Sequence, residues 1–159
     1  MKKNVCVTKL HVLCLLVFVL SLGFAGAASA DPVKEEGALT TKPPTEDTVQ
    51  VKAAYKYLSA YTSDVSYSSG GKGSVIGNTG ASVTADFIGI DAAIQRWTGE
   101  EWVAVTSKTS SKNTSKTVSL NETFAASAGY YYRVVSTHTV RVGSDIEKAT
   151  YTSPSRLLK

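Results

Sequence analysis

The 159-residue chain has two cysteines, Cys6 and Cys14, and both lie within its first 30 residues. Histidine is equally scarce, because one of the two histidines lies in the same stretch. If residues 1–30 are removed, no cysteine remains for a disulfide or a thiolate ligand, and His138 is the one histidine left. The sequence therefore argues against redox chemistry and predicts neither a metal site nor a cofactor.

The chain also lacks a hydrophobic run that would cross a bilayer. Its one long apolar stretch, from Val12 to Leu22, is shorter than the roughly 20 residues that a membrane helix needs. Three lysines precede this stretch and the small residues 28–30 follow it, which is the pattern of a secretory signal peptide. We expect cleavage before Asp31 and a secreted, extracellular protein with no membrane partner. The alternative is that the segment stays uncleaved as an anchor.

A strong excess of one charge is absent as well. The chain has 17 basic and 13 acidic residues, and three lysines but no acid lie in residues 1–30, so 14 − 13 leaves a net charge of +1. Nucleic-acid binding by phosphate neutralisation needs a clustered excess of Lys and Arg. We therefore exclude nucleic acid as a partner.

Large apolar residues are nearly missing from residues 31–54, which carry Pro32, Pro43, Pro44 and several acids. Such a segment gains too little from burial to offset its ordering entropy, and it predicts a flexible leader, either a pro-segment or a spacer. Residues 55–159 are long enough for a single domain with its own core.

From residue 55 onward, apolar residues alternate with polar ones, and turn residues recur every eight to fifteen positions. This pattern predicts an all-β, antiparallel β-sandwich of about seven strands, with residues 107–115 as a polar connection. The predicted strands cover residues 64–68, 73–81, 88–97, 102–106, 117–123, 130–142 and 146–153.

The clearest hairpin is predicted around the turn at residues 98–101. A four-residue turn places Trp97 opposite Trp102, and two positions further Gln95 opposite Ala104. The same count places Ile94 opposite Val105, with both side chains facing the core.

The stretch from Phe124 through Gly129 to Val134 resembles the corner of fibronectin type III domains, where a tyrosine fixes the chain. A broader similarity covers most of residues 55–159. The turn at residues 71–73, the Gln95-Arg96-Trp97 and Trp102-Val103 segments and the Gly129–Val134 stretch resemble small secreted Gram-positive bacterial proteins of unknown function. That resemblance implies an immunoglobulin-like or fibronectin type III-like sandwich and an extracellular location, and it carries over no catalytic residue.

The two tryptophans carry the candidate site. Alternation predicts that both indoles lie on the sheet face opposite the isoleucines, where they would form a platform for a sugar ring. The candidate ligand-binding residues are Trp97, Trp102, Gln95, Asp91, Tyr131 and Arg133. The alternative is a packed cross-strand pair that stabilises the hairpin under residues 107–115.

No catalytic constellation accompanies this platform. His138 has no second histidine or cysteine near it in sequence, and the adjacent Glu100 and Glu101 belong to a tight turn. We therefore predict a non-enzymatic binding module for a cell-wall or extracellular glycan. A structural or protein-interaction module that binds another extracellular protein is the alternative, and an exported hydrolase is a third hypothesis that lacks its nucleophile, base and cleft.

Overall fold

The computed structural model describes residues 34–45, 54–68 and 70–159. The predicted signal peptide at residues 1–30 lies outside these residues, as do residues 31–33 and 46–53 of the predicted leader. Cleavage, secretion and the limits of the leader therefore stay predictions. In the described part of the chain, no helix is long and apolar enough to cross a membrane.

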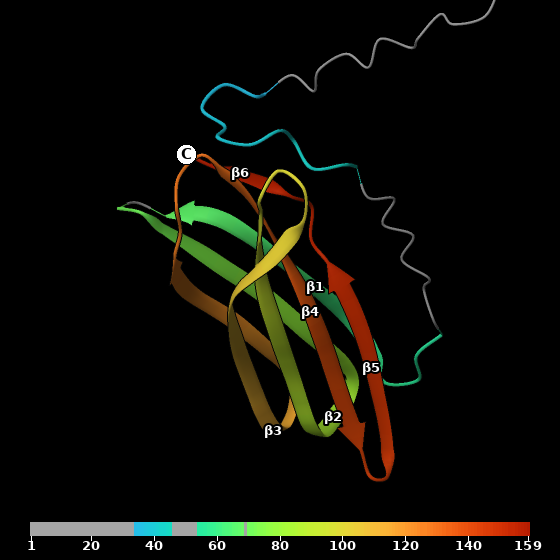
Figure 1. Ribbon diagram of the computed structural model, residues 1–159. Helices are drawn as coiled ribbons and strands as arrows, with labels where there is room; N and C mark the ends of the chain where they lie inside the picture. The colour runs from blue at the N-terminus through green and yellow to red at the C-terminus, as the bar shows by residue number, and fades with distance from the viewer. Residues whose placement is uncertain (1–33, 46–53, 69) are drawn as a thin grey trace, which may run out of the picture. The chain divides into compact units, whose positions relative to one another are not determined.

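The described chain is an antiparallel β structure, which confirms the predicted fold class at that level (Figure 1). The described residues form six strands, where the sequence predicted about seven. They are β1 (Leu58–Ser68), β2 (Lys72–Trp97), β3 (Trp102–Ala125), β4 (Tyr130–Val142), β5 (Asp145–Thr152) and β6 (Arg156–Leu158).

The strand count differs because β2 and β3 each join two of the predicted strands, whereas β6 was not predicted. β2 joins the predicted strands 73–81 and 88–97, and β3 joins 102–106 and 117–123 through the supposed connection at residues 107–115. That connection is a strand because β3 pairs with β2 along one edge only and its side chains there are mostly exposed, so polar residues are tolerated. Polar composition was therefore misread as a loop.

β2 and β3 are both irregular where residues 80–85 of β2 face residues 115–117 of β3. The β2–β3 register shifts between Gly80 and Ala85 of β2, and on β3 Thr114 has a positive φ of 49°. On the edge of β2 away from β3, residues 72–81 pair with β1, whereas residues 87–96 pair with β4. β5 and β6 extend the sheet beyond β4.

The sheet curls, so that the part with β1 packs over the part with β4. A Cβ atom added at Gly77 would lie 3.5 Å from Ile90 Cδ1. Gly77 belongs to the half of β2 that pairs with β1, and Ile90 to the half that pairs with β4, so the two halves face each other. The core fills the inside of the curl with fully buried side chains, which include Val65, Val75, Ile88, Ile90, Ile94, Val118, Tyr132, Val134 and Val140.

The hairpin between β2 and β3 confirms one part of its predicted register and corrects another. Trp97 pairs with Trp102 and Gln95 with Ala104, as predicted, but Ile94 pairs with Thr106. The register shift leaves Val105 as an additional residue on β3, and its side chain is 41% exposed instead of facing the core.

Candidate functional site

The six predicted site residues lie on one face of the sheet. Arg133 of β4 pairs with Gln95 of β2, and Trp97 pairs with Trp102 of β3. Because alternate residues of a strand share a face, Tyr131 and Asp91 lie on the same side. We call this surface the Trp102 face, defined by Asp91, Gln95, Trp97, Trp102, Tyr131 and Arg133.

Residues 34–45, which we call the N-terminal strap, belong to the predicted leader and contact the domain. The backbone N–H of Leu39 donates a 2.7 Å hydrogen bond to the carbonyl of Gly129, and a Cβ on Gly129 would lie 2.7 Å from Leu39 Cγ. Glu35 lies 3.7 Å from the Lys159 ammonium. Backbone hydrogen bonding, a side-chain contact of Leu39 and an ion pair therefore hold the strap against the domain.

Tyr131 is the first predicted site residue that the strap removes from the surface. Its side chain is 2% exposed, and its hydroxyl donates a 3.0 Å hydrogen bond to Glu35 Oε2. Burial, together with this hydrogen bond to Glu35, raises the pKa of the Tyr131 hydroxyl. The expectation that Tyr131 is an exposed ligand contact was therefore wrong.

Trp97 is also buried, with 6% of its surface exposed. Its ring centroid lies 5.4 Å from that of Trp102, and the two planes are tilted by 55°. The strap lies close to this hairpin. A Cβ atom added at Gly99 would be 3.8 Å from the side chain of Thr40. The two indoles therefore do not form the predicted exposed platform, and what was expected as the covering loop at residues 107–115 is part of β3.

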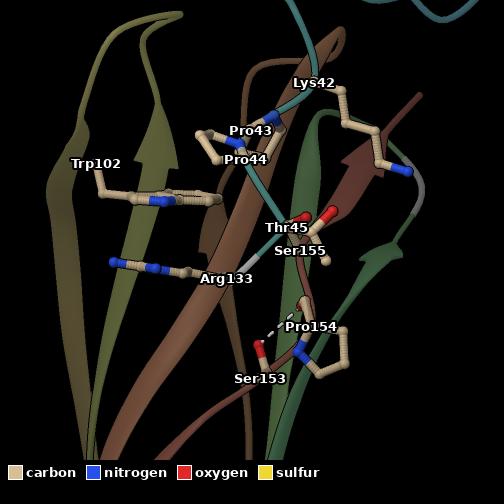
Figure 2. A pocket seen from close by; sticks show the side chains of 9 residues that line it. All are labelled: Lys42, Pro43, Pro44, Thr45, Trp102, Arg133, Ser153, Pro154 and Ser155. Carbon is tan, nitrogen blue, oxygen red and sulfur yellow. Dashed lines mark hydrogen bonds between the residues drawn. The ribbon is translucent and has the colours of Figure 1, made fainter. Parts of the chain in front are cut away.

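A pocket of about 280 Å³ remains open beside the half-buried Trp102 (Figure 2). Its walls come from the strap, the Trp102 face and the chain after β5. The lining residues are Lys42, Pro43, Pro44, Thr45, Trp102, Arg133, Ser153, Pro154 and Ser155.

Arg133 connects three of the predicted site residues. Its guanidinium carbon lies 4.3 Å from the Trp102 ring centroid, and its Nε donates a 2.7 Å hydrogen bond to Gln95 Oε1. Figure 2 shows the guanidinium alongside the indole. Cation–π contact and the hydrogen bond together fix the orientation of both planar groups. The structure thus groups Trp102, Arg133 and Gln95, whereas exposed Asp91 does not line the pocket.

Sequence reasoning missed the strap and the segment at residues 153–155. The Pro43-Pro44 pair was interpreted as a sign of disorder, yet Pro43 is buried at the pocket. Proline has a fixed φ and loses less entropy on ordering, so the proline pair in the leader is a signal that could have indicated an ordered segment.

A second polar cluster lies inside the curl around His138, whose side chain is fully buried. Its Nδ1 lies 2.7 Å from Thr79 Oγ1, and its Nε2 lies 2.8 Å from Ser136 Oγ. The hydroxyl of Ser63 in turn donates to Ser136 Oγ at 2.8 Å. Burial lowers the pKa of His138 to about 4, so the ring is neutral near pH 7.

The His138 cluster is structural in this arrangement. Its residues are Ser63, Thr79, Ser136 and His138, each at most 4% exposed, which leaves no path for a substrate to the serine–histidine pair. In the described residues, no group of three or more His, Cys, Asp or Glu side chains is arranged to hold a metal ion.

Comparisons with known proteins assign no family. No family model and no curated protein matches the chain. A solved structure described as the crystal structure of a protein from Archaeoglobus fulgidus aligns with 64% of this chain and 98% of its own, at 11% identity and a TM-score of 0.36. That similarity is too weak to transfer a fold type or an activity.

Proposed function

We propose that this protein is a secreted, non-enzymatic binding module that holds a ring of a cell-wall or extracellular polysaccharide in the pocket beside Trp102. The proposed secretion rests on the signal-peptide pattern at residues 1–30. We also propose that the curled sheet is of the immunoglobulin-like type. The observation that carries the proposal is the open pocket against an indole whose orientation is fixed by Arg133.

The chemistry of the pocket suits a sugar. An aromatic ring offers a flat apolar surface for the C–H face of a pyranose, and a few polar groups around it bind hydroxyls. Trp102 supplies that surface, and Thr45 and Ser155 add hydroxyls at the walls. The role is limited to one aromatic ring, because Trp97 and Tyr131 are buried.

Affinity electrophoresis against soluble polysaccharides, followed by titration calorimetry on any that retard the protein, tests this proposal. Trp102→Ala should abolish retardation, because the stacking surface is lost. Asp91→Asn is the matched control, since Asp91 is exposed on the same face but does not line the pocket. Equal binding by wild type and Trp102→Ala would contradict the proposal.

A protein-interaction module is the second candidate, because β3 pairs with β2 along one edge and with no other strand of the described chain. A free strand edge can accept a strand from a partner. Lys108, Lys112 and Lys116 on β3 oppose this use, since lysines on an edge strand discourage pairing. Elution volume over a range of concentrations tests the self-association form of this role.

A further inference from the structure

One wall of the Trp102 pocket belongs to the N-terminal strap (Figure 2). The strap contributes residues 42–45, and the sheet and the chain after β5 contribute the other described lining residues. Residues 34–45 contain neither helix nor strand, so no ladder of backbone hydrogen bonds fixes this wall. The shape of the pocket therefore depends on the individual contacts that hold the strap in place.

The polar contacts that hold the strap lie before this wall in the sequence. Glu35 accepts a 3.0 Å hydrogen bond from the Tyr131 hydroxyl, and the backbone N–H of Leu39 donates to the carbonyl of Gly129 at 2.7 Å. Residues 41–45, in contrast, make no hydrogen bond or ion pair with another described residue. The polar attachment of the wall to the domain is thus made several residues away, at Glu35 and Leu39.

Thr40 weakens the attachment of the strap. Its side chain is buried, with 8% of its surface exposed, and its hydroxyl has no hydrogen-bond partner among the described residues. A buried polar group without a partner loses the hydrogen bonds that water would give it. Detachment of the strap would return this hydroxyl to water, so the few contacts at Glu35 and Leu39 hold the strap against an opposing cost.

We infer that Glu35 and Tyr131, neither of which lines the pocket, are positioning residues for the ligand site: their hydrogen bond holds the strap, and the docked strap supplies one wall of the pocket. This inference rests on the proposed function and adds how the site is formed. A ligand that contacts the strap binds the docked form, so binding and docking stabilise each other. The apparent dissociation constant rises as the docked fraction falls.

Titration calorimetry of residues 31–159, the predicted mature protein, with chitohexaose, laminarihexaose and xylohexaose measures the effect on affinity. Glu35→Ala and Tyr131→Phe should each weaken binding of the tightest of these ligands by about threefold to tenfold. One hydrogen bond to a charged group changes the docking equilibrium by about that ratio. The double variant should lose little more than Glu35→Ala alone, because both changes remove the same bond.

Glu36→Ala is the matched control. Glu36 is the exposed neighbour of Glu35, carries the same charge, and its side chain makes no hydrogen bond or ion pair with another described residue. This variant should bind like the wild type. An equal loss of affinity in Glu35→Ala and Glu36→Ala would mean that the charge of the strap acts instead of its attachment, and this would overturn the inference.

Chymotrypsin cleavage between Leu39 and Thr40, located by mass spectrometry, reports docking of the strap separately from affinity. This bond should be cut faster in Glu35→Ala and Tyr131→Phe than in the wild type. A ligand at ten times its dissociation constant should slow the cleavage of the wild type roughly tenfold. Leu39 and Thr40 do not line the pocket, so protection there reports the docked strap and not direct shielding by the ligand.

The combined results separate the inference from the proposed function. Faster cleavage with unchanged affinity means that binding does not need the docked strap, and unchanged cleavage means that the bond between Glu35 and Tyr131 does not hold it. Either result overturns the inference and leaves the proposed function intact, provided that the wild type binds one of the hexasaccharides. Absence of binding to all three overturns both.

Discussion

Lowering the pH from 7.5 to 4.5 should destabilise the domain through the single buried side chain of His138. The ring is fully buried, and both of its nitrogens are engaged by hydroxyl groups. One proton arrangement satisfies the whole cluster: Ser136 donates to Nε2, Nδ1–H donates to Thr79, and Thr79 donates to the carbonyl of Gly89 at 3.3 Å. That arrangement requires a neutral imidazole.

The sign and size of the effect follow from the pKa of His138 in the two states. It is about 4 in the folded protein, because burial disfavours the charged ring, and 6.5 in the unfolded chain. A depressed folded pKa gives stabilisation that is complete above pH 6.5 and is lost as the pH falls toward 4. The loss should reach about 2.5 kcal/mol by pH 4.5, which is a large share of the 5–15 kcal/mol typical of a domain.

Urea unfolding of residues 31–159, followed by tryptophan fluorescence at several pH values, measures this loss. His138 is the one histidine of that chain, so few other groups titrate between pH 6.5 and 4.5. Glu147 titrates lower: although desolvation alone would raise its pKa, hydrogen bonds from three backbone N–H groups of residues 56–58 lower it.

His138→Gln is the control, and its stability should vary much less across this range even if its absolute stability is lower. If that variant does not fold, an NMR titration of the wild-type imidazole provides the same answer. A ring that titrates near pH 6.5 in the folded protein, or a wild type equally stable at both pH values, would refute the reasoning.

Two further predictions concern the Trp102 face. Trp97→Ala should lower the free energy of unfolding, measured in urea, by about 3–5 kcal/mol, because it leaves a cavity at a buried site. Trp102→Ala should cost clearly less, since that ring borders the open pocket. Equal losses in the two variants would contradict this assignment. Tyr131→Phe and Glu35→Gln should each lower stability, and their double-mutant cycle should give a coupling of about 1 kcal/mol from the shared hydrogen bond. A coupling of zero would mean that the strap is not held on the domain in solution.

Apart from residues 107–115 and β6, the presence of strands and most side-chain directions were predictable from the sequence, because both depend on alternation within a few residues. Counting outward from the turn at residues 98–101 placed Trp97 opposite Trp102 and put Gln95 and Asp91 on the same face, whereas the pairing of β4 with β2 brought Tyr131 and Arg133 to that face. The count failed at Val105, where one additional residue in β3 shifts the register. A bulge leaves no periodic signal, so alternation across it gives the wrong partner.

Exposure of the same residues was not predictable, because it depends on what packs over the face. Tyr131 and Arg133 both lie on the Trp102 face, yet Tyr131 is buried by the strap and Arg133 lines an open pocket. The contact between Glu35 and Tyr131 joins residues 96 positions apart, and no local pattern encodes such a distance.

The sequence by itself determined the all-β class and the hairpin at residues 98–101, since these follow from local geometry. The tertiary structure decided that β2 and β3 are continuous, that residues 34–45 contact the sheet, and that one indole faces a pocket while the other is buried. Those outcomes depend on long-range packing, in which polar and proline-rich segments become ordered through bonds to distant residues instead of through their own hydrophobicity.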